Sequence, residues 1–161
     1  LEFTAARAGA EVRRTPVGEA HVVAEMRRCG AVLGGEGNGG VIDPEVHLGR
    51  DSAVAFARLC EAEARLPGGL RARAAEFPPR WLRKEKLPVP SGGLPTVEPA
   101  LEAVLGPVSD RRDGLRWTRP DGFVHVRASG TEPVMRVVLE AGSADGCRAT
   151  LEQLRSALGG R

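Results

Sequence analysis

The chain has 161 residues, which is room for one medium domain or two small ones with a buried core. Its 23 Lys and Arg nearly balance its 21 Asp and Glu, so charge alone draws it neither to nucleic acid nor to a membrane surface. No uninterrupted apolar run is long enough to span a bilayer and no signal peptide begins the sequence, so we expect a cytoplasmic protein without a membrane partner.

The three cysteines, Cys29, Cys60 and Cys147, lie far apart in the chain and form no C-x-x-C or Cys/His pattern. Their number is odd, so they do not form a fully paired framework. We expect reduced, partly buried thiols, with neither disulfides nor a metal site.

The first block of the chain alternates expected helices and strands. We expect the tail of a helix in residues 1–10, a strand in residues 11–14, a helix in residues 18–29 capped by Gly30, and a strand in residues 31–33. A further helix is capped by Asp51 or Ser52 and ends at Pro67-Gly68-Gly69. Alternating strands and helices predict an α/β layer arrangement.

Proline and glycine crowd residues 77–95, which we expect to form an interdomain hinge. Beyond it the pattern predicts a helix in residues 96–105, strands in residues 114–119, 123–127 and 134–141, and a final helix in residues 144–158. Strands followed by a covering helix indicate a compact α+β unit. The expected domains are therefore residues 1–76 and residues 96–161, joined by the hinge.

Residues 127–133 read Arg-Ala-Ser-Gly-Thr-Glu-Pro and form the expected tip of a hairpin between the last two strands. Gly130 allows a positive φ, so that successive backbone N–H groups can point into one concavity that suits an anion. The Ser129 and Thr131 hydroxyls can donate to phosphate oxygens, and Arg127 offers a charged fork that fits phosphate. The alternative is an ordinary turn, since Ser, Gly, Thr and Pro are common turn residues.

Residues 34–40 form a second loop, Gly-Gly-Glu-Gly-Asn-Gly-Gly. Its five glycines let the backbone approach a ligand closely. Glu36 can accept hydrogen bonds from sugar hydroxyls, and Asn38 can both donate and accept them, so the pair suits two adjacent hydroxyls. The alternative is a flexible connection.

The two loops resemble signature motifs of the α-D-phosphohexomutases, a family that includes phosphoglucomutase, phosphomannomutase and phosphoglucosamine mutase. R-A-S-G-T-E-P-x-x-R, from Arg127 to Arg136, is similar to the family's C-terminal phosphate-binding signature, and the segment around Glu36 and Asn38 is similar to its G-E-x-[SN]-G sugar-recognition loop. The resemblance covers nearly the whole chain, as the later part of the third domain and all of the fourth. It implies a partial three-layer α/β domain followed by a small α+β domain, an antiparallel sheet backed by two helices.

The resemblance implies an enzyme that interconverts hexose 1-phosphate and hexose 6-phosphate, of glucose or mannose, through a phosphoserine and a hexose 1,6-bisphosphate intermediate. It assigns the substrate phosphate to Arg127, Ser129, Gly130 and Thr131, and the sugar to Glu36 and Asn38. No T-x-S-H-N-like phosphoserine segment and no D-G-D-x-D-R metal loop occurs in the sequence. Mg²⁺ and the nucleophile would therefore belong to missing N-terminal domains of the same enzyme, and the chain alone would be inactive.

Glu19 follows Val17-Gly18, where some phosphohexomutases place a His that aids proton transfer, so it is the catalytic candidate of the chain. The alternative is that Glu19 serves the helix macrodipole from the first helical turn. His21 is expected on the helix surface or at the core edge. His125 is expected on the strand face beside the phosphate loop.

Two other interpretations stay open. The resemblance also fits phosphoglucosamine mutase. A different class, a non-catalytic nucleic-acid or anion-binding module, agrees with the many Arg residues, but aromatic residues make up only 4% of the chain and Tyr is absent, so platforms for base stacking are scarce. We therefore expect a phosphorylated hexose as the partner, and no nucleic acid.

Overall fold

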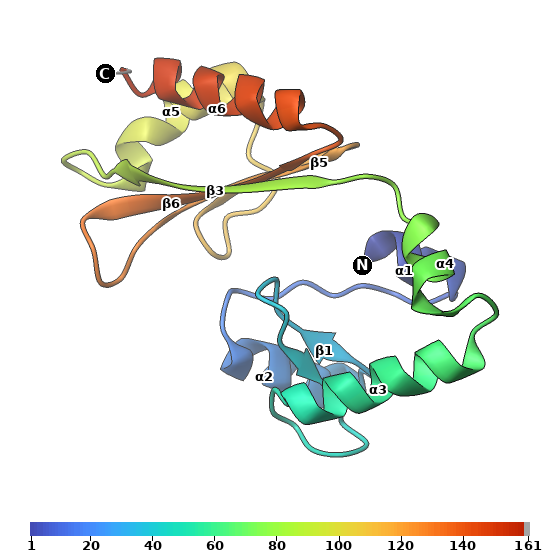
Figure 1. Ribbon diagram of the computed structural model, residues 1–161. Coiled ribbons are helices and arrows are strands. Elements are labelled where there is room, and N and C mark those ends of the chain that lie inside the picture. The colour runs from blue at the N-terminus through green and yellow to red at the C-terminus, as the bar shows by residue number, and fades with distance from the viewer. Residues whose placement is uncertain (160–161) are drawn as a thin grey trace. The chain divides into compact units, whose positions relative to one another are not determined.

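The computed structural model describes residues 1–159 and divides into two compact units, Leu1–Phe77 (unit 1) and a second that begins at Pro78 (unit 2). Unit 1 contains α1 (Glu2–Arg7), α2 (Glu19–Cys29), β1 (Gly34–Gly35), β2 (Val41–Ile42), α3 (Ser52–Arg65) and α4 (Gly69–Ala75) (Figure 1). Unit 2 contains β3 (Trp81–Pro88), α5 (Leu94–Leu105), β4 (Leu115–Arg119), β5 (Gly122–Ala128), β6 (Val134–Ala141) and α6 (Ala144–Ala157). Within residues 1–159 no helix has the length and apolar character needed to cross a membrane.

Glycines set both ends of α2. Gly18, with a φ of 131°, precedes the first turn, and Gly30 closes the helix in the left-handed conformation with a φ of 65°. Glu19 lies in the first turn, where a carboxylate interacts favourably with the helix macrodipole. The helix expected in residues 18–29 is confirmed, and Glu19 occupies a fixed point at its start.

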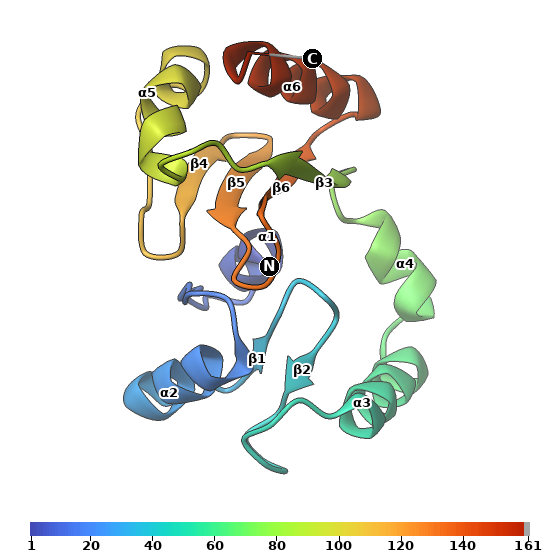
Figure 2. The ribbon, with the colours of Figure 1, turned by 90° about the vertical axis from the view of Figure 1, so that its left-hand side faces the viewer.

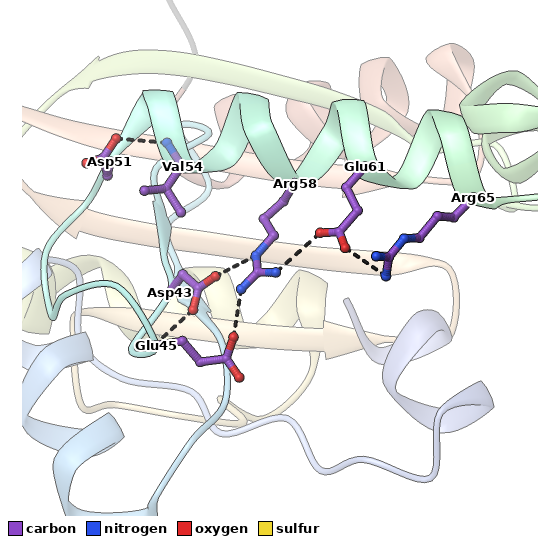
Figure 3. Close-up of polar contacts among 7 residues, drawn as sticks. All are labelled: Asp43, Glu45, Asp51, Val54, Arg58, Glu61 and Arg65. Atoms are coloured by element: carbon purple, nitrogen blue, oxygen red, sulfur yellow. Dashed lines mark hydrogen bonds and ion pairs between the residues drawn. The ribbon is translucent and has the colours of Figure 1, made fainter.

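Asp51 caps the N-terminus of α3, and an ion pair holds this helix to the segment after β2. The Asp51 carboxylate accepts hydrogen bonds from the backbone N of Ala53 and Val54, at 2.7 and 3.0 Å, as expected for a helix cap. Farther along the helix, Arg58 Nε donates to Asp43 Oδ2 at 2.8 Å (Figure 3). Because Asp43 follows β2 directly, this contact ties α3 to the end of the β1–β2 hairpin.

Two expectations for unit 1 are wrong in detail, and one of its helices is not expected at all. Residues 11–14 form no strand, because no strand among residues 1–77 pairs with them. The strand after α2 begins at Gly34 instead of within residues 31–33, since only Gly34 and Gly35 pair with β2. Helix α4 is not expected from the sequence, because it is short and begins at a pair of glycines that is typical of a loop.

Unit 1 buries few hydrophobic side chains. Met26 of α2 and Ile42 of β2 are its buried hydrophobic residues, with 3% and 0% of their surface exposed. On α3, Phe56 and Leu59 remain 68% and 52% exposed. These two residues, the apolar stripe of α3, are therefore open to solvent.

Four antiparallel strands in the order β3-β6-β5-β4 form the sheet of unit 2, and α5 and α6 cover one of its faces (Figures 1 and 2). Every second residue of β6 is buried, including Met135, Val137 and Leu139. Trp117 of β4 and Leu101 of α5 belong to the same core. The expected antiparallel sheet backed by two helices is confirmed. Among the residues of unit 2 up to 159, no helix covers the other face.

Strand β3 corrects the expectation of a hinge throughout residues 77–95. Its eight residues pair in continuous register with β6, from Trp81 opposite Ala141 to Pro88 opposite Val134. The proline is tolerated because β3 lies at the edge of the sheet. Most of its side chains are exposed, so the apolar alternation by which a sequence reveals a strand is weak.

Candidate functional site

The β5–β6 hairpin brings the expected phosphate-binding residues into one loop. Arg127 lies near the end of β5, and residues 129–133 connect the two strands. The backbone N of Ser129 donates to Val134 O at 2.8 Å, which closes the loop, and the Ser129 hydroxyl accepts a longer hydrogen bond from Thr131 N at 3.5 Å. The guanidinium, both hydroxyls and the backbone between them thus belong to five consecutive residues at the end of β5 and in the loop after it.

Gly130 does not have the positive φ expected for a backbone nest. The loop reverses the chain without it, since hydrogen bonds of the backbone N of Ser129 and Val134 close the turn. A Cβ at Gly130 would meet no atom within 4 Å, so the backbone there is open to an approaching ligand. The position allows an anion to come close, although the nest conformation is absent.

Arg127 lies at the end of β5 beside this loop, and no carboxylate of the described residues forms an ion pair with it. Lys86 and Arg136, by contrast, both contact Glu132. His125, two residues before Arg127 on the same strand face, has its Nε2 against Asp113 O. A guanidinium that no carboxylate neutralises attracts an anion, and phosphate matches its fork geometry.

In unit 1 the glycine loop of residues 34–40 spans the β1–β2 connection. Glu36 N donates to Gly40 O at 2.9 Å, and Gly40 N donates to Asn38 Oδ1 at 3.1 Å. A Cβ at Gly35 would lie 2.7 Å from Gly40 O, so the two chain segments approach more closely than a side chain allows. Glu36 and Asn38 are therefore held in a tight, hydrogen-bonded loop, which argues against a flexible connection.

Arg50, which no sequence motif indicates as a site residue, contacts the glycine loop. Its Nη1 lies 2.8 Å from Glu36 Oε2, and its Nε donates to Glu19 Oε2 at 2.7 Å. Its aliphatic stem packs on Gly40, where any Cβ would overlap Arg50 Cδ. Glu36 is 13% exposed, and its other oxygen, Oε1, makes no hydrogen bond within the described residues. No local spacing predicts this bridge, because its partners lie far away in the chain.

The contact with Arg50 keeps Glu19 ionised. The hydrogen bonds from the Arg50 side chain and backbone hold the pKa of Glu19 below its ordinary value of 4.5. A carboxyl with a lowered pKa is charged at neutral pH and is poorly suited to donate a proton. The contact with Arg50 therefore explains the charge and the orientation of the Glu19 side chain. A catalytic role for Glu19 stays a prediction.

The histidines and carboxylates near the glycine loop do not fit a Mg²⁺ ion. Glu19 and Glu36 both bind the Arg50 guanidinium, whose charge repels a cation. His47 Nε2 lies 3.0 Å from the carboxylate that caps α3, and His21 is exposed on α2, as expected. Among residues 1–159 no three His, Cys, Asp or Glu side chains are grouped as metal ligands would be.

Two models of one family match almost the whole chain. Residues 1–80 match the model described as phosphoglucomutase/phosphomannomutase, alpha/beta/alpha domain III, and residues 86–157 match the C-terminal domain of the same family. The chain belongs to the phosphoglucomutase/phosphomannomutase family. The glycine loop of residues 34–40 lies in the segment that matches domain III, and the loop of residues 129–133 lies in the segment that matches the C-terminal domain. These matches confirm the family that the two loop motifs indicate. They also confirm the expected fold classes, α/β for the first domain and α+β for the second.

Relatives of the chain come from several organisms. A phosphoglucomutase/phosphomannomutase from Thermococcus kodakarensis is 37% identical over 94% of this chain and 34% of its own length. A probable phosphoglucosamine mutase from Methanopyrus kandleri is 37% identical over 87% of this chain and 32% of its own length. A crystal structure of a family protein from Burkholderia thailandensis matches with a TM-score of 0.73 at 28% identity, over 95% of this chain and 33% of that one. The chain thus spans about a third of the length of these relatives.

Proposed function

We propose that the chain is the sugar- and phosphate-binding part of a phosphohexomutase that interconverts hexose 1-phosphate and hexose 6-phosphate, with glucose or mannose as the sugar. The observation that carries the proposal is Arg127, a guanidinium without an ion pair in the described chain, at an open hairpin loop in the segment that matches the family's C-terminal domain. In this function Arg127, Ser129, Gly130 and Thr131 bind the phosphate that does not react, and Glu36 and Asn38 bind the sugar hydroxyls.

The phosphate loop has donors for several oxygens of one anion. The Arg127 guanidinium can donate two parallel hydrogen bonds to a phosphate group. The Ser129 and Thr131 hydroxyls can donate to the remaining oxygens. The absence of a side chain at Gly130 leaves room for the anion beside the backbone. Together these groups anchor one end of the substrate.

The glycine loop has one acceptor and one donor group to offer a sugar. Glu36 accepts hydrogen bonds from hydroxyls through Oε1, because Oε2 contacts Arg50. Asn38 donates through its amide nitrogen, because its Oδ1 already accepts from Gly40 N. An acceptor beside a donor suits two adjacent hydroxyls, which the pyranose ring of a hexose presents.

The described residues bind and orient a substrate; they do not transfer its phosphoryl group. Phosphoryl transfer depends mainly on positioning and on the stabilisation of charge. In the proposal, a phosphoserine and Mg²⁺ belong to other domains of a complete enzyme, in which hexose 1,6-bisphosphate is the intermediate, and the chain by itself is inactive. The proposed location is the cytoplasm, which cell fractionation tests.

Titration with glucose 6-phosphate, followed by NMR, tests the phosphate site on the chain itself. We expect the amide of Gly130 to shift, and Arg127→Ala to weaken binding by about tenfold or more, because a charge-assisted hydrogen bond is lost. Arg148→Ala is the matched control, since Arg148 on α6 is exposed and pairs with Asp145. Equal affinities of the two variants would overturn the phosphate site. Binding of single-stranded RNA in place of the sugar phosphate would favour a nucleic-acid-binding module.

Glucosamine phosphate is the second candidate substrate. The probable phosphoglucosamine mutase from Methanopyrus kandleri is 37% identical to this chain, as is the Thermococcus kodakarensis protein. The amino group of glucosamine is cationic and would pair with the Glu36 carboxylate. If glucosamine is preferred, Glu36→Gln loses more affinity for glucosamine 6-phosphate than for glucose 6-phosphate, and an equal loss for both sugars would favour glucose or mannose.

A further inference from the structure

Three basic side chains lie in one row across the sheet of unit 2. In the antiparallel register Lys86 of β3 is opposite Arg136 of β6, and Arg136 is opposite Arg127 of β5. Directly opposite residues point to the same face, and the neighbouring residue Met135 points to the other face, into the core under the helices. The row therefore lies on the face away from α5 and α6, beside the loop of residues 129–133.

Glu132, within this loop, contacts two of the three cations. Lys86 Nζ lies 2.8 Å from Glu132 Oε1, and Arg136 Nη2 lies 3.4 Å from Oε2. The hydrogen bond from Lys86, with its charge and that of Arg136, holds the pKa of Glu132 below 4.5. Glu132 is thus ionised at neutral pH. Three positive charges and one negative charge leave the row with two uncompensated positive charges.

The row has more donors than Glu132 can satisfy. Arg136 Nε is buried and has no hydrogen-bond partner within the described chain, and such a donor is costly. Arg127 makes no ion pair within residues 1–159. A single carboxylate therefore compensates the row only in part.

We propose that Glu132 is an internal counter-ion of the phosphate site, which a bound phosphate group displaces, and that Lys86 then becomes a further contact of that phosphate. The inference rests on the proposed function, because it takes the loop beside Arg127 as the phosphate site. Exchanging the single charge of Glu132 for the two charges of a phosphate dianion brings the row closer to neutrality. A singly charged anion gains nothing by the exchange, so Glu132 makes the site selective for doubly charged phosphate groups.

Titration of the chain with inorganic phosphate at constant ionic strength, followed by NMR, tests this role. Glu132→Gln keeps the size of the side chain and removes its charge, so phosphate should bind about three- to tenfold more tightly. Lys86→Met keeps the aliphatic stem, and phosphate should bind more weakly by a similar factor. Lys84→Met is the matched control, because Lys84 lies on the same strand face opposite Val138, one row farther from the loop. Its affinity should equal that of the wild type.

Unchanged or weaker binding by Glu132→Gln would overturn the counter-ion, and equal affinities of Lys86→Met and Lys84→Met would overturn the contact with Lys86. Acetate that binds the wild type as tightly as phosphate would overturn the selectivity for dianions. If Arg127→Ala loses phosphate binding while the Glu132 and Lys86 variants keep the wild-type affinity, the roles of Glu132 and Lys86 are wrong and the phosphate site remains. Unchanged binding in Arg127→Ala removes the phosphate site and thus the proposed function.

Discussion

Arg50 binds Glu19 through two donors: its backbone N donates to Oε1 at 3.2 Å and its Nε donates to Oε2 at 2.7 Å. The same guanidinium contacts Glu36 in the glycine loop at 2.8 Å. One side chain thereby joins the start of α2, the glycine loop and the turn before α3. The orientation of Glu36, and with it the proposed sugar contact, therefore depends on Arg50.

Arg50→Met should loosen the glycine loop, because it frees the Glu36 carboxylate. We expect amides of residues 36–40 to exchange faster, and glucose 6-phosphate to bind up to about fivefold more weakly, as for other partly exposed ion pairs. NMR measures both quantities. Arg27→Met on α2 is the control, since Arg27 makes no ion pair within residues 1–159. Matching exchange rates in the two variants would contradict the role of Arg50.

Acid should destabilise unit 1 through Asp43. This carboxylate is 7% exposed, and the side-chain hydrogen bond from Arg58 holds its pKa below the ordinary 3.8 (Figure 3). A carboxyl whose pKa is lower in the folded chain than in the unfolded chain stabilises the fold above the unfolded pKa. That stability is lost as the pH falls through the folded pKa. We therefore expect the melting temperature of unit 1 to decrease below about pH 4.

Asp43→Asn tests this origin of the acid sensitivity. The variant should melt at a lower temperature than the wild type at neutral pH, and the difference should shrink in acid, where Asp43 of the wild type is also uncharged. Circular dichroism at a series of pH values measures both. Glu45→Gln removes the 79%-exposed partner of the same Arg58 and should change little. If the melting temperature of Asp43→Asn falls with pH as steeply as that of the wild type, other carboxylates cause the loss of stability in acid.

The hairpin that carries Arg127 follows from the sequence, whereas β3 does not. Apolar residues alternate on both sides of residues 127–133, and the buried Val126 and Val137 confirm this pattern. Strand β3 is an edge strand, and charged side chains such as Lys84 protect an edge from further pairing. The same charges remove the apolar alternation by which a sequence reveals a strand.

The candidate site, too, can be predicted from the sequence only in part. Glycines alone reveal the loop that contains Glu36 and Asn38, but Arg50 reaches it from beyond β2, and no local spacing indicates that contact. At Gly130 the sequence permits a positive φ without requiring one. The hydrogen bonds that close the loop, such as that of Ser129 N, decide its conformation, and these depend on how the strands pair.

Leu101→Ala should destabilise unit 2 by about 2 to 5 kcal/mol, because it leaves a cavity in a packed core. Leu101 is 0% exposed. Trp117 is buried in the same core, where its Nε1 donates to Gly106 O at 2.8 Å, so its fluorescence in denaturant follows the unfolding of this unit. Leu59→Ala, at a 52%-exposed position of α3, is the control and should change stability by less than about 0.5 kcal/mol. Similar losses in both variants would contradict a separate core in unit 2.

Amide hydrogen exchange should distinguish the two units. Among residues 78–159, thirteen buried residues form the core of unit 2, whereas Met26 and Ile42 are the buried hydrophobic residues of unit 1. Because burial of apolar surface is the main source of stability, segments with little of it open more readily. We expect amides of residues 114–158 to exchange more slowly than those of residues 1–66 in a dilute, monomeric sample. Mass spectrometry of exchanged peptides measures the difference.

The apolar stripe of α3 makes protein concentration the necessary control in that experiment. Phe56 and Leu59 are exposed there. A second copy of the chain can cover such apolar side chains, and this would protect residues 1–66 only as the concentration rises. Phe56→Ser should then reduce the dependence on concentration. Equal protection of both units that does not change with concentration would mean that unit 1 is stable by itself, and the prediction would be wrong.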